Sequence, residues 1–314
     1  MSLTLIEASK LMINRGEVQR SAVVETYAMS SDILRVLPFR DIAGNAYAYN
    51  QEQTLPGIGF RGVNAGYTAS TGIINPQVEP LVIAGGDLSI DPFIIKTGGE
   101  GVRERHQIMK IKALAHAWTL ALIKGSSVTT PASLDGLQVR LTGSQLTANG
   151  TTDGGDALSL EKLDALIDSV DNPTHLIMNK KMRRRLSVAA RTAAVGGNIS
   201  WTKDEFGKAV MLYDELPIII ADRDHTGADI LNFLEASNNA GAAGTATATS
   251  IYCISVGDGM LEGIQNGSID VRMVGEQAAT VTELTRVEWY NGICIEHPRA
   301  AARLYSILDA VAVA

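Results

Sequence analysis

Residues 44–72 read GNAYAYNQEQTLPGIGFRGVNAGYTASTG, and this stretch constrains the architecture more than any other. The pattern predicts a long β-hairpin whose outgoing arm carries Tyr47 and Tyr49 on one side and whose return arm carries Phe60 and Tyr67. The ribbon is too polar and too rich in glycine to supply a core face, and a long exposed ribbon invites pairing with another chain. We therefore expect that a neighbouring subunit covers it, and that these four aromatic residues make the inter-subunit contact.

The composition describes a globular protein with no strong charge signature. A chain of 314 residues is long enough for one large domain or two closely associated ones. The formal net charge of -7 argues against a dedicated nucleic-acid binder, which usually carries a basic face. Residues 96–124 depart from this balance, with six Lys or Arg and two acidic residues.

Cysteine usage and the first residues of the sequence indicate in which cellular compartment the protein folds. Cys253 and Cys294 lie in apolar runs far apart, which predicts buried free thiols rather than a disulfide framework or a metal cluster. The start MSLTLIEASK does not resemble a cleavable leader, and no apolar run approaches the roughly 20 residues of a membrane span. We expect a protein that folds in a cytoplasm without membrane contact.

Hydrophobic periodicity predicts an α+β fold. Residues 1–40 show two amphipathic helical stretches, and Asp91 followed by Pro92 is a typical helix start. The pattern from 102 to 124 predicts one long helix, roughly 33 Å at 1.5 Å per residue. Helices and strands then interleave without the βαβ alternation of a doubly wound sheet. The further expected elements are a strand at 137–141, a helix at 157–170, a strand at 175–179, a basic helix at 180–194, a strand pair at 210–222, a mobile low-complexity stretch at 236–250 and a β-rich tail at 268–308.

Motifs of catalysis and ligand binding are weak. Residues 57–62 spell GxGxxG, but a dinucleotide site needs a strand before the motif and a helix after it, so a bend in the hairpin is the better interpretation. Asp222, Asp224 and His225 form the one local group that could bind a cation, although such a group is more often a solvated loop. We expect no catalytic residues, no cofactor and no metal, and hence no enzyme.

The strongest basic run, Lys180 to Arg185, leaves two interpretations open. It could contact phosphates, or it could be an exposed face that meets acidic residues of the same chain or of a neighbouring subunit. We favour the second interpretation.

The order of these parts resembles the major capsid protein of tailed bacteriophages, which has the Hong Kong ninety-seven-like fold. Residues 44–72 are similar to the extended loop of that family, and 91–125 resemble its passage from a strand into the spine helix. Shorter segments add to the likeness. They are LDGL at 134–137, HLIMNKKMRRRL with Asn179 opening a helix, MLYDELPIIIAD with Leu216–Pro217, and WYNGICIEHPRAAARL at 289–304.

The resemblance implies a domain layout. Residues 1–43 would be the N-terminal arm, and 44–80 the extended β-hairpin loop. Residues 81–156 would be the peripheral domain with its spine helix at 102–124, and 157–265 the axial domain. Residues 266–314 would return to the peripheral domain and end the chain.

The resemblance also implies a structural role. Many copies would form hexamers and pentamers of an icosahedral phage head that encloses double-stranded DNA, held by non-specific contact. The head would be assembled in the host cytoplasm with a portal, a separate scaffolding protein and decoration proteins. Some members cross-link subunits through a loop lysine, but there is no lysine here between Lys10 and Lys96, so we expect no isopeptide bonds. The alternatives are an encapsulin-like nanocompartment shell and a cytoplasmic α/β enzyme.

Overall fold

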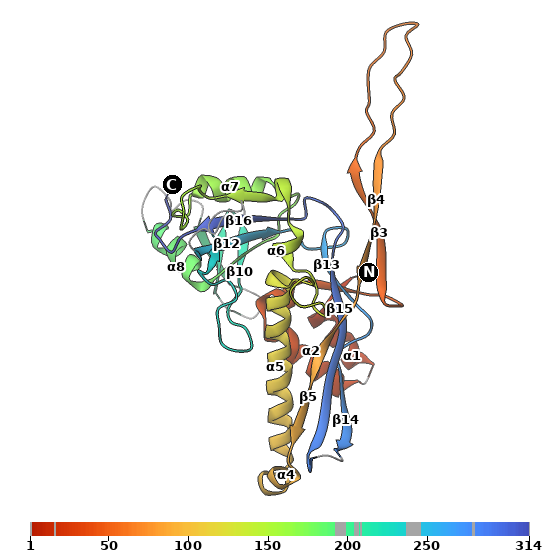
Figure 1. Ribbon diagram of the computed structural model, residues 1–314, viewed down its shortest axis with the longest axis vertical. Helices are drawn as coiled ribbons and strands as arrows, with labels where there is room; N and C mark the ends of the chain where they lie inside the picture. The colour runs from red at the N-terminus through yellow and green to blue at the C-terminus, as the bar shows by residue number, and fades with distance from the viewer. Residues whose placement is uncertain are drawn as a thin grey trace.

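The computed structural model describes residues 2–15, 17–191, 199–203, 207, 209–236, 246–277 and 280–313. Two mixed sheets, a long helix and a projecting hairpin make up the molecule (Figure 1). Of the low-complexity stretch at 236–250, residues 237–245 lie outside the described residues, and 246–250 belong to a strand.

The N-terminal segment is helical, as its periodicity predicts. A capping box starts the first helix, because Thr4 Oγ1 accepts from Glu7 N while the Glu7 carboxylate accepts from Thr4 N at 2.9 Å. Pro38 follows the last helix and begins a strand that joins the first sheet. The elements are β1 (Leu3–Thr4), α1 (Leu5–Asn14), α2 (Val18–Met29), α3 (Asp32–Val36) and β2 (Pro38–Asp41).

The hairpin exists, but its return strand lies later in the chain than the sequence suggests. β3 (Ala46–Thr54) pairs antiparallel with β4 (Ile73–Pro80), with Tyr47 opposite Glu79. The expected return arm through Phe60 and Tyr67 is therefore wrong. Residues 55–72 form no ladder, because Pro56 lacks a backbone donor and the frequent glycines offer no side chains for cross-strand packing. We call 44–80 the hairpin arm and 55–72 its tip.

The first sheet and the long helix form an elongated layer below the hairpin arm (Figure 1). The helix expected at 102–124 is confirmed as α5 (Glu100–Lys124), which packs along β5 (Val82–Ile90) and β15 (Glu283–Ile295). The expected start at Asp91 is also confirmed, since its carboxylate accepts from Phe93 N at 2.8 Å. The remaining elements are α4 (Pro92–Gly98), β13 (Leu261–Gln265) and β14 (Asp270–Glu276).

The second sheet has the strand order β6-β16-β12-β7-β10-β9-β8, with β11 paired to β12. It includes β6 and β16, which lie outside the range 157–265 expected for the axial domain. The strand expected at 137–141 is wrong: this segment is the short helix α6 (Leu137–Arg140), begun by Val139 N and Arg140 N donating to Gly136 O, both at 3.1 Å. The other elements are a 3₁₀ turn (Gly143–Gln145), β6 (Leu146–Ala148), α7 (Leu160–Asp168), β7 (His175–Met178), α8 (Lys180–Ala189), β8 (Ile199–Lys203), β9 (Ala209–Tyr213), β10 (Leu216–Ile220), β11 (Glu235–Ala236), β12 (Ala246–Ile254) and β16 (Ala301–Ile307).

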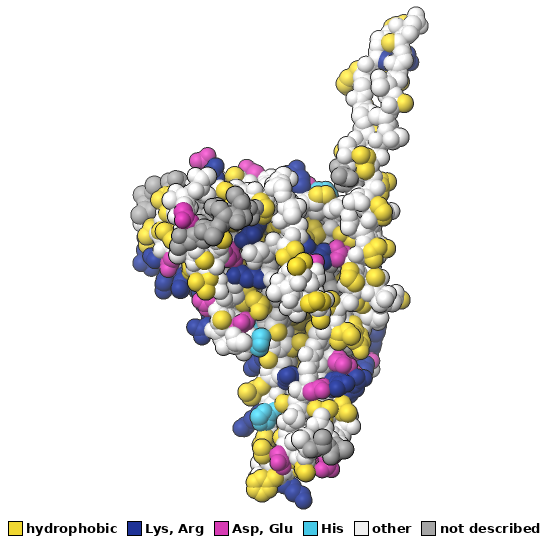
Figure 2. Space-filling view, viewed as in Figure 1, with side chains coloured by type: hydrophobic (Ala, Val, Ile, Leu, Met, Phe, Trp, Pro, Cys, Tyr) yellow, Lys and Arg dark blue, Asp and Glu magenta, His cyan; other side chains and the backbone are white. Residues whose placement is uncertain are grey.

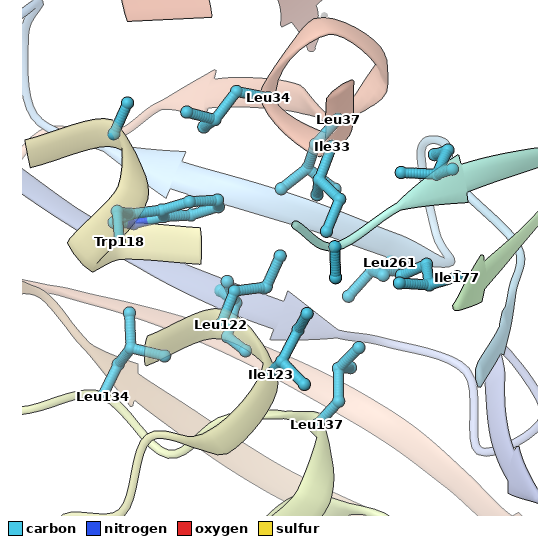
Figure 3. Packing of buried hydrophobic residues seen from close by; sticks show 14 of the residues in the cluster. Ile33, Leu34, Leu37, Trp118, Leu122, Ile123, Leu134, Leu137, Ile177 and Leu261 are labelled. Atoms are coloured by element: carbon cyan, nitrogen blue, oxygen red, sulfur yellow. The ribbon is translucent and has the colours of Figure 1, made fainter. Parts of the chain in front are cut away.

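One apolar cluster joins the N-terminal helices, the long helix and both sheets (Figure 3). Trp118 of α5 lies against Trp289 of β15 with ring centroids 5.8 Å apart, and its indole Nε1 donates to Asn291 Oδ1 at 2.7 Å. A second cluster fills the space between α7, α8 and the second sheet. Both cysteines are buried and free, as expected. Within the described ranges, no helix has the length and apolar character that crossing a membrane requires.

Candidate assembly interface

Among the residues that the structure describes, the tip of the hairpin arm is the most exposed apolar segment. Phe60 is 106% exposed, Ile58 93% and Tyr67 70%. Figure 2 shows the arm projecting well beyond the body, with hydrophobic side chains along it. The contacts that the structure shows for the tip are local: Ser70 Oγ donates to Gly57 O at 2.9 Å, and the guanidinium of Arg61 lies 5.3 Å from the centre of the Tyr67 ring. The tip thus carries apolar surface that its own chain does not cover.

The outgoing strand is anchored to the body at its base. The Tyr47 hydroxyl donates to Glu296 Oε1 at 2.8 Å and accepts from Arg40 Nη1, while the Arg40 guanidinium lies 5.1 Å from the ring centre. Tyr49 donates to Ile295 O at 3.0 Å, and its ring stacks on that of Tyr47 with centroids 5.9 Å apart. Two neighbouring tyrosines on one strand face therefore tie β3 to the end of β15.

The return strand has its own anchor. Arg140 of α6 holds Glu79 of β4 through two parallel hydrogen bonds, with Nη2 to Oε2 at 2.7 Å. Both side chains are largely buried, at 20% and 13% exposure. A bidentate guanidinium–carboxylate pair fixes direction as well as distance. Together with the tyrosines it sets the angle at which the arm leaves the body.

Arg40 is shared by several acids. Its Nη2 pairs with Asp258 and lies 2.7 Å from Glu262 Oε1, and its Nη1 lies 3.6 Å from Glu296 Oε1. Burial raises the pKa of the Glu262 carboxyl to about 7, although Arg40 opposes this shift. Burial and the hydrogen bond to Glu296 raise the pKa of Tyr47 to about 12. We call Arg40, Tyr47, Asp258, Glu262 and Glu296 the base cluster.

The four aromatic residues selected from the sequence fall into two groups. Phe60 and Tyr67 lie on the exposed tip, and their contact with a neighbouring subunit stays a prediction. Tyr47 and Tyr49 lie at the base, where their hydroxyls bind the chain's own body. The structure therefore gives these two a positioning role that sequence reasoning missed, because their partners are about 250 residues away.

Sequence reasoning also missed exposed apolar residues on the return strand and the strand after it. Ile74 and Val78 are 63% and 62% exposed, and Ile83 of β5 is 69% exposed. Ile74 and Val78 are four positions apart on a strand and so face the same side. The segment GIINPQVEPLVI carries that period-two spacing, which could have identified them.

The basic helix α8 meets acids of its own chain at two points. Lys180 pairs with Asp222, and Arg185 Nε donates to Asp309 Oδ1 at 2.8 Å. This agrees with the interpretation of an exposed face that meets acidic residues. Asp222 is thereby engaged, and Asp224 accepts from Thr226 N at 2.8 Å and Ala228 N at 2.9 Å. Among the described residues, no group of three or more His, Cys, Asp or Glu side chains could hold a metal ion.

Comparison with known proteins reveals a likeness in fold alone. No protein-family model matches the sequence, and no curated protein does. An encapsulin from Synechococcus elongatus, in its holo complex, matches with a TM-score of 0.64 over 90% of this chain and 89% of that chain, at 16% identity. The capsid of an empty GTA particle matches with a TM-score of 0.62 over 88% and 90%, at 13% identity. A structure from Mycobacterium phage Bobi matches with a TM-score of 0.59 over 90% and 91%, at 11% identity.

These matches cover 88–90% of this chain. This chain therefore has the α+β Hong Kong ninety-seven-like fold of major capsid proteins.

Proposed function

We propose that this chain is the structural subunit of a closed protein shell, and specifically a phage-type major capsid protein. Copies would form the hexamers and pentamers of an icosahedral head around double-stranded DNA, located in the virion and assembled in the host cytoplasm. The observation that carries the proposal is the hairpin arm: it is held firmly at its base while its apolar tip stays uncovered. The role is structural, without catalysis.

Exposed apolar surface explains why copies would associate. Each tip would bury Phe60, Tyr67 and their neighbours against another subunit, which removes apolar area from water at roughly 25 cal/mol per Å². Permanent interfaces commonly bury roughly 2,000 Å² or more. In a closed shell every subunit both gives and receives such a contact, so individually weak contacts accumulate.

Further partners follow from the same proposal. A portal, a separate scaffolding protein and decoration proteins would complete the head, and packaged DNA would be held by non-specific contact. The hairpin arm contains no lysine, since none occurs between Lys10 and Lys96. An isopeptide bond from this arm would lack its amine, so the shell would be held by non-covalent contacts.

The test is to image purified particles by electron microscopy and to identify their contents. Replacing the tip, residues 55–72, by a two-residue Asn-Gly turn should leave a folded subunit that builds no shells. The far-ultraviolet circular dichroism of this variant and its melting temperature should match those of the parent, because the tip contributes nothing to either core. Intact shells from the shortened chain would contradict the proposed role of the tip.

An encapsulin-like shell is the second candidate, since one of the matched structures is an encapsulin complex. Particle contents separate the two functions. A nuclease-protected genome would support the phage head, whereas a co-purifying enzyme without nucleic acid would support the nanocompartment.

A further inference from the structure

The base cluster contains a buried carboxyl group, on Glu262, whose negative charge would be only partly balanced by a nearby cation. Three carboxylates, on Asp258, Glu262 and Glu296, converge on the one guanidinium of Arg40. The Glu262 side chain is 0% exposed, and the one polar partner that the described residues show for its carboxylate is the guanidinium of Arg40. Its ion pair with Arg40 is 2.7 Å long, but that cation is shared. An ionised carboxylate in such a place is unfavourable relative to one in water.

Arg40 links this acid to the hairpin arm. Its Nη2 reaches Glu262 on β13, and its Nη1 donates to the hydroxyl of Tyr47 on β3. The Tyr47 ring also lies 5.1 Å from the guanidinium. The base of the arm sits beside β13 and β15 (Figure 1). Lifting the base of the arm would take Tyr47 away from Arg40 and open a path for water to the Arg40–Glu262 pair.

We propose that Glu262 is a proton-controlled latch for the hairpin arm. When its carboxyl is protonated, Arg40 stays between Glu262 and Tyr47 and the arm is held at one angle. When it is ionised, a hydrated arrangement with an open base becomes more favourable, and the arm is freer to change its angle. The consequence for shell assembly rests on the proposed function, whereas the latch itself is a property of the single chain.

The direction of the pH dependence follows from linkage. Burial raises the pKa of Glu262 from 4.5 to about 7, with Glu296 and Asp258 adding to the shift and Arg40 opposing it. A covered group with a raised pKa holds its proton more tightly than the open form does. Opening of the base is thus independent of Glu262 below pH 4.5, becomes easier as the pH rises toward 7, and levels off above 7.

Arg40, Tyr47 and Cys294, which surround Glu262, keep their protonation state near neutral pH. The pKa of Arg40 is raised by its acidic neighbours, so it stays a cation. The pKa of Tyr47 is about 12, and burial raises the pKa of Cys294, which pairs with Glu262 across the sheet, so both stay neutral. Among the groups of the base cluster with a shifted pKa, Glu262 is the one that changes charge between pH 5 and 8.

Amide hydrogen exchange of the full chain from pH 5 to 8 tests the latch, after correction for intrinsic exchange rates. Peptides covering the base (45–49 and 78–81) should show opening that increases about tenfold or more over this range. Peptides from the tip should show no such rise. Glu262→Gln, which keeps the shape and removes the titration, should give a flat profile. Asp258→Asn is the comparison variant, because this acid binds the same arginine but is 72% exposed. The rise should remain but become smaller, since Asp258 adds to the raised pKa of Glu262.

Two outcomes would overturn the latch: a flat profile in the parent chain, or a rise that survives in Glu262→Gln. Tyr47→Phe is a second variant that keeps Glu262. It should open more readily at every pH with the rise intact, and loss of the rise in this variant would also count against the proposal. Imaging keeps the two proposals apart. If shells form but hydrogen exchange at the base does not depend on pH, only the latch is overturned. If exchange rises with pH but the chain never forms shells, only the shell function is overturned.

Discussion

Aromatic residues of this chain are exposed at the hairpin tip and buried in the tryptophan cluster, which consists of Tyr27, Phe39, Trp118 and Trp289. Phe60 is 106% exposed, whereas Trp289 is 1% exposed and packs against Tyr27, Phe39 and Trp118. Both regions carry apolar side chains. The cluster collects them from four elements, α2, β2, α5 and β15, while the tip is a single ribbon whose side chains are exposed. The residues that stabilise the fold and the apolar surface left open to other copies therefore lie in separate parts of this molecule.

Truncating one aromatic side chain in each region should give the largest difference in the free energy of unfolding. Trp289→Ala should lower the free energy of unfolding by about 3–5 kcal/mol, because it leaves a cavity beside three aromatic rings. Phe60→Ala should change it by less than about 0.5 kcal/mol, because the side chain is in solvent. Urea unfolding of the two variants measures both values. A comparable loss for Phe60→Ala would show that the tip packs on its own body.

Removing an anchor at the base of the arm should lower the free energy of unfolding by an intermediate amount. Arg140→Ala removes both hydrogen bonds to Glu79 and leaves a largely buried carboxylate without its cation, so we expect a loss of about 1.5–3 kcal/mol. Urea unfolding gives this value, and hydrogen exchange should report faster opening of β4.

Arg286→Ala is the matched control for Arg140→Ala. Arg286 also holds a carboxylate through two bonds, to Asp87 at 2.7 and 2.9 Å, but on the open face of the first sheet. Solvent screens that pair, so the loss should be clearly smaller. Equal losses would mean that burial of the Arg140–Glu79 pair does not matter.

The smallest expected effect concerns covalent linkage. Boiling assembled particles in detergent should release single chains of 33.4 kDa, because the hairpin arm offers no lysine amine. Denaturing gel electrophoresis shows this directly. A ladder of covalent multimers would contradict the absence of cross-links.

Much of the fold could be predicted from local pattern. The capped helix starts at Thr4 and Asp91, the unbroken helix to Lys124 and the strand pair around Leu216–Pro217 all follow from neighbouring residues. Two local predictions failed. The return strand of the hairpin is shifted to 73–80, and the segment at 137–141 is a helical turn. Short segments satisfy turn and strand propensities equally well, so the secondary structure that they adopt depends on the elements packed beside them.

The candidate interface was predictable only in part. Exposure of Phe60 and Tyr67 followed from the glycine-rich composition around them. The use of Tyr47 and Tyr49 as anchors did not, since alternation on a strand assigns side chains to a face but does not say what that face meets.

Local sequence is sufficient to place the capped helix start at Asp91, to show that a long ribbon projects with little to bury, and to show that the arm contains no lysine. Each of these depends on residues close together in the chain, through backbone hydrogen bonding, side-chain periodicity or composition. Only the tertiary structure decided that Tyr47 binds Glu296, 249 positions away, that Arg140 holds Glu79, and that Glu262 lies buried under a shared arginine. The contacts of Tyr47 and Glu262 arise because β2, β13 and β15 meet in one sheet beside the hairpin, and the Arg140–Glu79 pair arises because α6 lies beside β4. Local pattern does not encode which elements become neighbours.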